Sequence, residues 1–177
     1  RLSLVGSEMC IRDRGLTSST AGITVQQGCS FNSFNALGVT VSGGGMGIRS
    51  GSTGGAAAPG NDLTCYGFTP QETSSVASGT VKVDYSLFQS GGTKIKYLGF
   101  YYGSIDTYNS INFYSSGNTL LQTITGQALI NAFNLQSGNR ANSNLYVNLD
   151  FAANETFSAF EFVTTQRAFE LDNVVVG

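Results

Sequence analysis

The chain has 177 residues, a formal net charge of −2 and no histidine. Only 11% of its residues are charged, compared with roughly 25% in a typical soluble domain, and no basic cluster could neutralise several phosphates, so nucleic-acid binding is not expected. The absence of histidine excludes Ser-His-Asp and Cys-His mechanisms and removes the commonest transition-metal ligand.

Residues 1–14 differ in character from everything that follows. They hold three of the nine Lys and Arg residues, and the stretch 4–14 (LVGSEMCIRDR) resembles a translation of the transposon-end adapter used to build sequencing libraries. A remnant of this kind would not belong to the folded domain. The alternative is that residues 1–14 are a genuine short strand or the remains of a signal peptide. We therefore expect residues 15–177 to form a single domain with a net charge of about −3, from six basic and nine acidic residues.

Apolar and polar residues alternate with period two along most of the chain, which predicts strands separated by turns rich in Gly, Ser and Asn. The segment 95–102 becomes apolar on both faces, as a central strand does, while 126–133 has the spacing of one short helix. The Gly-, Ser- and Ala-rich segment 43–60 is expected to be a long surface loop. The predicted strands are 81–87, 95–102, 111–113, 121–124, 145–151, 160–162 and 169–175, with weaker candidates at 22–25, 37–42 and 63–68. This arrangement predicts an all-β fold, an antiparallel β-sandwich of jelly-roll-like form.

Two cysteines remain once Cys10 is set aside with residues 1–14. Cys29 and Cys65 are an even pair in a chain with few charges, which suits an oxidising compartment and favours a disulfide. The alternative is two free buried thiols, since cysteine packs well as a small apolar residue.

Few residues in the chain suggest catalysis. Glu161 and Glu170 could supply the two carboxylates of a glycosidase, but both are expected to be exposed on strands, and no acid/base motif brackets them. The glycine runs 43–47 and 51–55 lack the Lys-Ser/Thr of a phosphate-binding loop. We therefore expect no enzymatic activity.

A polar loop follows the strand 95–102 and admits two interpretations. In the first, Ser104, Asp106 and Asn109 bond the backbone amides of their own loop and fix the corner between two strands. In the second, the loop is a shallow sugar-binding site. Tyr102 or Tyr108 would then stack on a sugar ring, while Asp106 and Asn109 would reach its hydroxyl groups.

One metal site is conceivable, at the last predicted strand. Asp172, together with Asp62, offers the carboxylate oxygens that Ca²⁺ prefers. The alternative is that Asp172 is an inward or edge residue bonded to neighbouring backbone amides. No other cofactor is expected.

Several motifs occur in the order found in a known family. The segment 99–117 (GFYYGSIDTYNSINFYSSG), followed by Thr125-Gly126, by YVN at 146–148 and by AFELDNV at 168–174, resembles the exosortase-dependent (PEP-CTERM) surface proteins of Gram-negative bacteria. The stretch 50–66 is similar to the upstream portion of that family. A departure is Tyr102, where the family usually has Trp.

The resemblance implies export to the surface of a Gram-negative bacterium and association with exopolysaccharide or other matrix components. It also implies a signal peptide and a C-terminal sorting tail, through which alone the protein would meet the membrane, so the chain is expected to be a fragment truncated at both ends. The first functional hypothesis is a structural or adhesive matrix domain without catalysis. The alternative is a carbohydrate-binding module recognising exopolysaccharide, and the third is a glycan-active enzyme, which a groove with paired acidic residues would favour.

Overall fold

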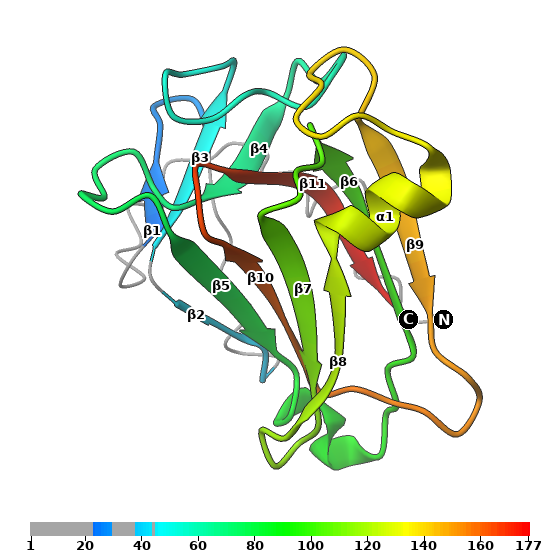
Figure 1. Cartoon of the computed structure of the whole chain (residues 1–177). Coiled ribbons are helices and arrows are strands. Elements are labelled where there is room, and N and C mark those ends of the chain that lie inside the picture. Colours follow the sequence, from blue (N-terminus) through cyan, green and yellow to red (C-terminus); the bar gives the residue numbers. More distant parts are fainter. Residues whose placement is uncertain (1–22, 30–37, 44) are drawn as a thin grey trace.

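A computed structural model describes residues 23–29, 38–43 and 45–177 of the chain. Two sheets pack face to face, which confirms the predicted all-β sandwich (Figure 1). The six-stranded sheet contains, in spatial order, β1 (Ile23–Val25), β3 (Met46–Ser50), β4 (Cys65–Thr69), β11 (Phe169–Val176), β6 (Tyr97–Gly103) and β9 (Leu145–Asp150). The five-stranded sheet contains β2 (Thr40–Gly43), β5 (Gly79–Asp84), β10 (Ala159–Thr164), β7 (Asn109–Tyr114) and β8 (Leu120–Thr125). Neighbouring strands are antiparallel except β1 and β3, which are parallel.

The main core lies between the two sheets and is rich in aromatic rings. Phe100 of β6 contacts Phe162 of β10 with ring centroids 5.1 Å apart, and Phe162 contacts Phe169 of β11 at 4.9 Å. All three side chains are buried. Burying a side chain of this size contributes roughly 1.5–3 kcal/mol, so this cluster is a large part of what joins the sheets.

The predicted elements of the second half of the chain are confirmed. Helix α1 (Gly126–Phe133) coincides with the predicted helix, and it begins where the Thr125 hydroxyl accepts a hydrogen bond from the Ala128 amide at 3.1 Å. Strand β6 has β11 on one side and β9 on the other, as expected of a strand inside a sheet. A short 3₁₀ helix, η2 (Phe88–Gly91), follows β5.

The prediction of a surface loop over 43–60 is wrong for its first part, because β3 pairs with β4 there. Gly47 explains the error. A Cβ atom at this position would lie 2.2 Å from Cζ of Phe68, so the glycine permits close packing of a strand and does not mark a flexible loop.

A disulfide joins Cys29 and Cys65, as predicted, with Cα atoms 5.9 Å apart. It connects the segment after β1 to the start of β4. Residues 1–14 lie outside the described residues, so their interpretation as an adapter-derived remnant stays a prediction.

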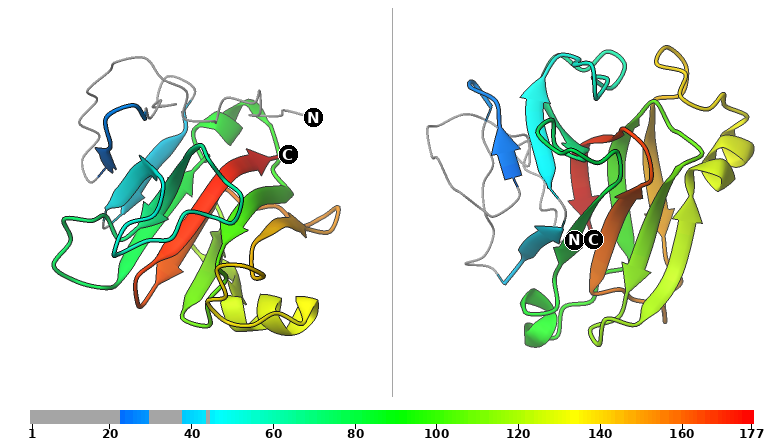
Figure 2. Two further views of the ribbon diagram at one scale, coloured as in Figure 1. Left: turned by 90° about the horizontal axis from the view of Figure 1, so that it is seen from above. Right: turned by 60° about the vertical axis from the view of Figure 1, so that its left-hand side comes forward.

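The loop 51–64 leaves β3 and folds back over the outer face of the six-stranded sheet. Ala56 of this loop packs with Tyr66, Phe68 and Ala168 in a second apolar cluster on that face. The loop also meets the segment after α1, because the Gly60 amide donates to Oδ1 of Asn144 at 2.8 Å. Figure 2 shows the two layers from further directions, with the connecting loops gathered at their ends. The residues of the candidate site come together where these segments meet.

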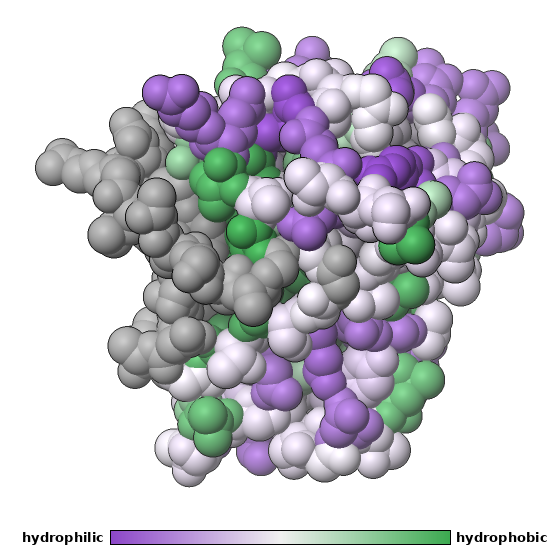
Figure 3. Space-filling view, turned by 90° about the vertical axis from the view of Figure 1, so that its left-hand side faces the viewer, coloured by the Kyte–Doolittle hydropathy of each residue, from purple (hydrophilic) through white to green (hydrophobic). Residues whose placement is uncertain are grey.

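Figure 3 shows one side of the molecule, where hydrophilic and neutral residues predominate and apolar residues appear in several small groups. Among the described residues, no helix has both the length and the apolar character needed to cross a membrane.

Candidate ligand-binding cavity

Glu170 is buried on β11, which corrects the expectation that it is an exposed strand residue. The alternation of side chains along β11 points Glu170 away from the main core, but the loop 51–64 covers it. Oε1 accepts a hydrogen bond from the Ala57 amide at 2.8 Å, and the Ser104 hydroxyl lies 3.4 Å from Oε2. Burial raises the pKa of Glu170 to about 8, more than these hydrogen bonds lower it. The side chain is therefore mostly protonated at neutral pH.

A cavity of about 190 Å³ opens beside Glu170. One wall is formed by residues 54–57, which are glycine and alanine. Because these residues have little or no side chain, a ligand can approach their main chain closely. The polar and charged side chains that line the cavity are Ser104, Asp106, Tyr108, Arg140, Arg167 and Glu170. They come from the loop after β6, the segment after α1, the turn before β11 and β11 itself.

Asp106 lines the same cavity and is also buried. The Ser137 hydroxyl donates to its Oδ1 at 3.3 Å. Burial raises the pKa of Asp106, while hydrogen bonds from Tyr108 and Ser137 and the charge of Arg140 act in the other direction. Gly138 has φ of 64°, and a Cβ atom there would lie 2.6 Å from Oδ1 of Asp106, so a glycine is required beside this carboxylate.

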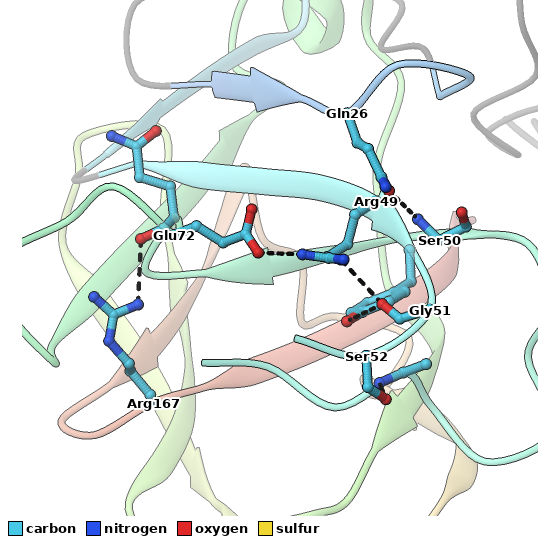
Figure 4. Close-up of polar contacts among 10 residues, drawn as sticks. Gln26, Arg49, Ser50, Gly51, Ser52, Glu72 and Arg167 are labelled. Atoms are coloured by element: carbon cyan, nitrogen blue, oxygen red, sulfur yellow. Dashed lines mark hydrogen bonds and ion pairs between the residues drawn. The ribbon is translucent and has the colours of Figure 1, made fainter. Parts of the chain in front are cut away.

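Two arginines bring positive charge to the cavity. Arg140 is exposed on the segment after α1. Arg167 is held in place, because its guanidinium donates to the Gln71 carbonyl at 3.3 Å (Figure 4) and also to the Ser74 carbonyl. The peptide bond between Arg167 and Ala168 is cis. Because Glu170 is mostly protonated at neutral pH, the two arginines outweigh the negative charge of the side chains that line the cavity.

The structure divides the predicted sugar-binding residues into two groups. Ser104, Asp106 and Tyr108 line the cavity, with the Tyr108 hydroxyl donating to the Arg167 carbonyl at 3.0 Å. Tyr102 and Asn109 do not line it.

Tyr102 has no exposed ring face, contrary to the stacking interpretation. It is 1% exposed and stacks on Phe169, with ring centroids 4.3 Å apart and an interplanar angle of 5°. The period-two alternation of β6 points it into the main core. Asn109 is also buried, and its Nδ2 donates to the Ala168 carbonyl at 3.2 Å.

The corner interpretation is only partly correct. Asp106 is buried, as that interpretation requires, but its Oδ1 accepts a hydrogen bond from the Ser137 side chain and not from an amide of its own loop. Asp106 therefore has one feature of each interpretation, because its carboxyl group is buried and also lines a cavity.

The predicted metal ligands Asp62 and Asp172 do come together. The Thr64 hydroxyl lies 2.6 Å from Oδ1 of Asp62 and 3.3 Å from Oδ2 of Asp172, and Asn173 Nδ2 donates to that same Oδ2 at 3.2 Å. Burial, and to a smaller extent Asp62, raises the pKa of Asp172. Within the described ranges no group of three or more His, Cys, Asp or Glu residues could hold a metal ion, so this is a pair of carboxylates. Calcium binding here stays a prediction.

The sequence patterns missed Glu170 and Arg140 as cavity residues. Strand alternation correctly places Glu170 on the outer face, but it cannot show that a loop more than a hundred residues earlier covers that face. The available signal was the run of small residues at 54–58, which fits closely over a sheet.

No protein-family model and no curated protein match this sequence. Among solved structures, the chain is similar to the enzymatically active domain of bacteriophage CBA120 tailspike protein 4, with 13% identity and a TM-score of 0.39. The match covers 78% of this chain and 19% of that one, so the chain spans about a fifth of the length of the tailspike structure.

Proposed function

We propose that this domain is an exported, non-catalytic adhesive domain of a Gram-negative cell surface or biofilm matrix, and that it binds a saccharide unit of exopolysaccharide in the cavity. The observation that carries the proposal is the convergence of Asp106, Tyr108 and Arg140 on one small polar space. Sugar hydroxyl groups both donate and accept hydrogen bonds, and this cavity offers both kinds of partner. A small number of placed polar groups in a concave site is what fixes a ligand's orientation.

Two further features support export and surface association. The disulfide between Cys29 and Cys65 suits an oxidising compartment. The motifs shared with the exosortase-dependent surface proteins suggest the same destination, and they include Ser104, Asp106 and Tyr108 of the cavity.

Glycoside hydrolysis is the second candidate, because Asp106 and Glu170 line the same cavity. A carboxyl group with a pKa of about 8 would be a protonated acid, the form that a general acid needs at neutral pH. Binding without catalysis is favoured because Glu170 is only 3% exposed and both of its oxygens face protein donors, the Ala57 amide and the Ser104 hydroxyl. A general acid must instead reach the glycosidic oxygen of its substrate.

Glycan-array binding followed by calorimetry tests the proposal. Arg140→Ala removes an exposed cavity side chain without opening the core, and we expect a loss of affinity of roughly tenfold or more, the size of one charge-assisted hydrogen bond. Lys94→Ala is the matched control, because it removes one exposed positive charge elsewhere. Equal affinity for both variants, or no binding by the unaltered protein, would reject the cavity as the site.

The same glycans decide between binding and hydrolysis. We expect no release of reducing ends during prolonged incubation. Release that Glu170→Gln abolishes would establish the hydrolase instead.

A further inference from the structure

The outer face of the six-stranded sheet continues beyond the loop 51–64 and carries a second distinct surface. Along β6, Tyr97, Gly99 and Tyr101 alternate outward, while Leu98, Phe100 and Tyr102 point into the main core. On β9, the outward and exposed residues are Tyr146, Asn148 and Asp150. Strands β6, β9 and β11 lie next to one another in the sheet (Figure 1).

Two tyrosine side chains converge over Gly99. A Cβ atom on Gly99 would lie 2.1 Å from the Tyr97 hydroxyl oxygen, 2.7 Å from Cζ of Tyr97 and 2.9 Å from the Tyr146 hydroxyl oxygen. Tyr97 therefore lies across the sheet and does not stand upright from it. The glycine is what permits this, since any other residue at 99 would occupy the same space.

Hydrogen bonds to the sheet hold both tyrosines in place. The Tyr97 hydroxyl donates to Oδ1 of Asn148 at 2.7 Å, and the Tyr146 hydroxyl donates to the Asn173 carbonyl at 3.2 Å. The register of β11 shifts between Asp172 and Val175, and Asn173 within this irregularity has φ of 51°. Such irregularities redirect backbone groups, and here one of them receives the Tyr146 hydroxyl.

These bonds leave the rings themselves as the accessible part of the pair. Tyr146 is 42% exposed although its hydroxyl is engaged with the sheet, so much of that exposure belongs to the ring. A rigid ring whose orientation is already fixed binds a partner with little further loss of conformational entropy.

We propose that Tyr97 and Tyr146, held over Gly99, form a stacking platform for a neutral glycan chain, with Asn148 and Asp150 at its rim to bond the sugar hydroxyl groups. A pyranose ring presents C–H groups on its face and hydroxyl groups around its edge. The platform offers the complementary arrangement, with ring surface at the centre and amide and carboxylate oxygens beside it.

The composition of this surface favours a glycan over a protein partner. The other large exposed apolar side chains of the described residues, among them Leu87, Leu120 and Phe133, belong to other elements. The platform therefore lacks the aliphatic centre that is typical of protein–protein interfaces. It shares no residue with the cavity, so it does not depend on the function proposed there.

Affinity electrophoresis in gels containing a soluble neutral β-glucan tests the platform, followed by calorimetry with its oligosaccharides. We expect Tyr146→Ala and Tyr97→Ala each to lower affinity by up to roughly tenfold, the upper range for one aromatic contact, and Gly99→Val to do the same by displacing both rings. Circular dichroism and the thermal midpoint show whether each variant is folded.

Tyr114→Ala is the matched control. Tyr114 is a half-buried tyrosine on the outer face of the other sheet, but the Lys82 ammonium lies 4.3 Å from its ring centroid and its hydroxyl donates to Glu161. Its ring face is therefore already occupied, and the variant should bind as the unaltered protein does.

The variants distinguish binding at the platform from binding in the cavity. Binding lost in Tyr146→Ala but retained in Arg140→Ala supports the platform, whatever happens at the cavity. Binding lost in Arg140→Ala but retained in Tyr97→Ala and Tyr146→Ala overturns the platform and leaves the cavity standing. An equal loss in Tyr114→Ala, or no retardation of the unaltered protein by the glucan, also overturns it.

Discussion

The Ala57 amide donates a hydrogen bond to Oε1 of Glu170, a residue 113 positions later in the chain, at 2.8 Å. This contact fastens the loop 51–64 to the outer face of β11 and closes one side of the cavity. It joins a neutral donor to a carboxyl group that burial keeps largely protonated. Several consequences for stability and binding depend on it.

The stability of the domain should fall as pH rises from about 4.5 to about 8. Glu170 has a pKa of about 8 in the folded protein against 4.5 when unperturbed, so in this window the folded state binds more protons than the unfolded state, and the free energy of unfolding decreases with pH. Asp172, whose pKa is also raised, acts in the same direction. The Glu170 contribution is on the order of a few kcal/mol. Urea unfolding across this range measures it.

The variant Glu170→Gln isolates that contribution. Glutamine keeps an acceptor for the Ala57 amide but does not ionise, so the free energy of unfolding of this variant should change less with pH. Glu155→Gln, at an exposed position, should keep the full dependence. A Glu170→Gln protein with an unchanged pH profile would show that another group is responsible.

The disulfide between Cys29 and Cys65 should contribute roughly 3–4 kcal/mol, because it closes a loop with a sequence separation of 36 in the unfolded chain. Reduction, or the double substitution of both cysteines by serine, should lower the urea midpoint accordingly. A Cys10→Ser background avoids competing pairs. Mass spectrometry should find one intramolecular bridge, and two free thiols after denaturation under oxidising conditions contradict the pairing.

The sequence predicted well what depends on local pattern. Period-two alternation located β5, β6, β9 and β11, because an apolar face must be buried whatever partner covers it. The short helix at 126–133 was equally clear, since its spacing and its Thr125 cap are local features.

What depends on distant contacts was not predictable in the same way. Gly47 lies in the glycine-rich segment predicted to be a surface loop, yet it makes room for the Phe68 ring of the neighbouring strand. Glu170 occupies an outward strand position, and only the loop that covers it makes it a buried acid. The cavity itself forms where four separate segments meet, so no single motif could show all of it.

The Asp62–Asp172 pair allows a direct test of the calcium prediction. If calcium binds, the thermal midpoint at about pH 8 should rise with Ca²⁺, EDTA should reverse the rise, and Asp62→Asn should abolish it. If calcium does not bind, Ca²⁺ has no effect, and Asp62→Asn stabilises the protein at about pH 8 by removing a charge that opposes ionisation of Asp172. We expect the second result, because burial raises the pKa of Asp172 and the two residues stand without a third acidic group among those the structure describes.

Asp106→Ala should cost about 1–3 kcal/mol of stability, because it leaves the Ser137 hydroxyl without its buried carboxyl partner. Asp106→Asn should cost less, since an amide oxygen can still accept from Ser137. Both variants remove a carboxyl group that lines the cavity with Arg140, so both should weaken saccharide binding there. Chemical denaturation measures the first effect and calorimetry the second.

The two Asp106 variants together separate support of the fold from contact with a ligand. If Asp106 only fixes the corner between β6 and β7, Asp106→Asn should bind every glycan as well as the unaltered protein does, and only stability should change. If the carboxylate also contacts a sugar, Asp106→Asn should lose affinity although its fold is nearly intact. We expect the loss of affinity, because Asp106 lines the cavity together with Arg140 and Tyr108 and is not enclosed by its own loop.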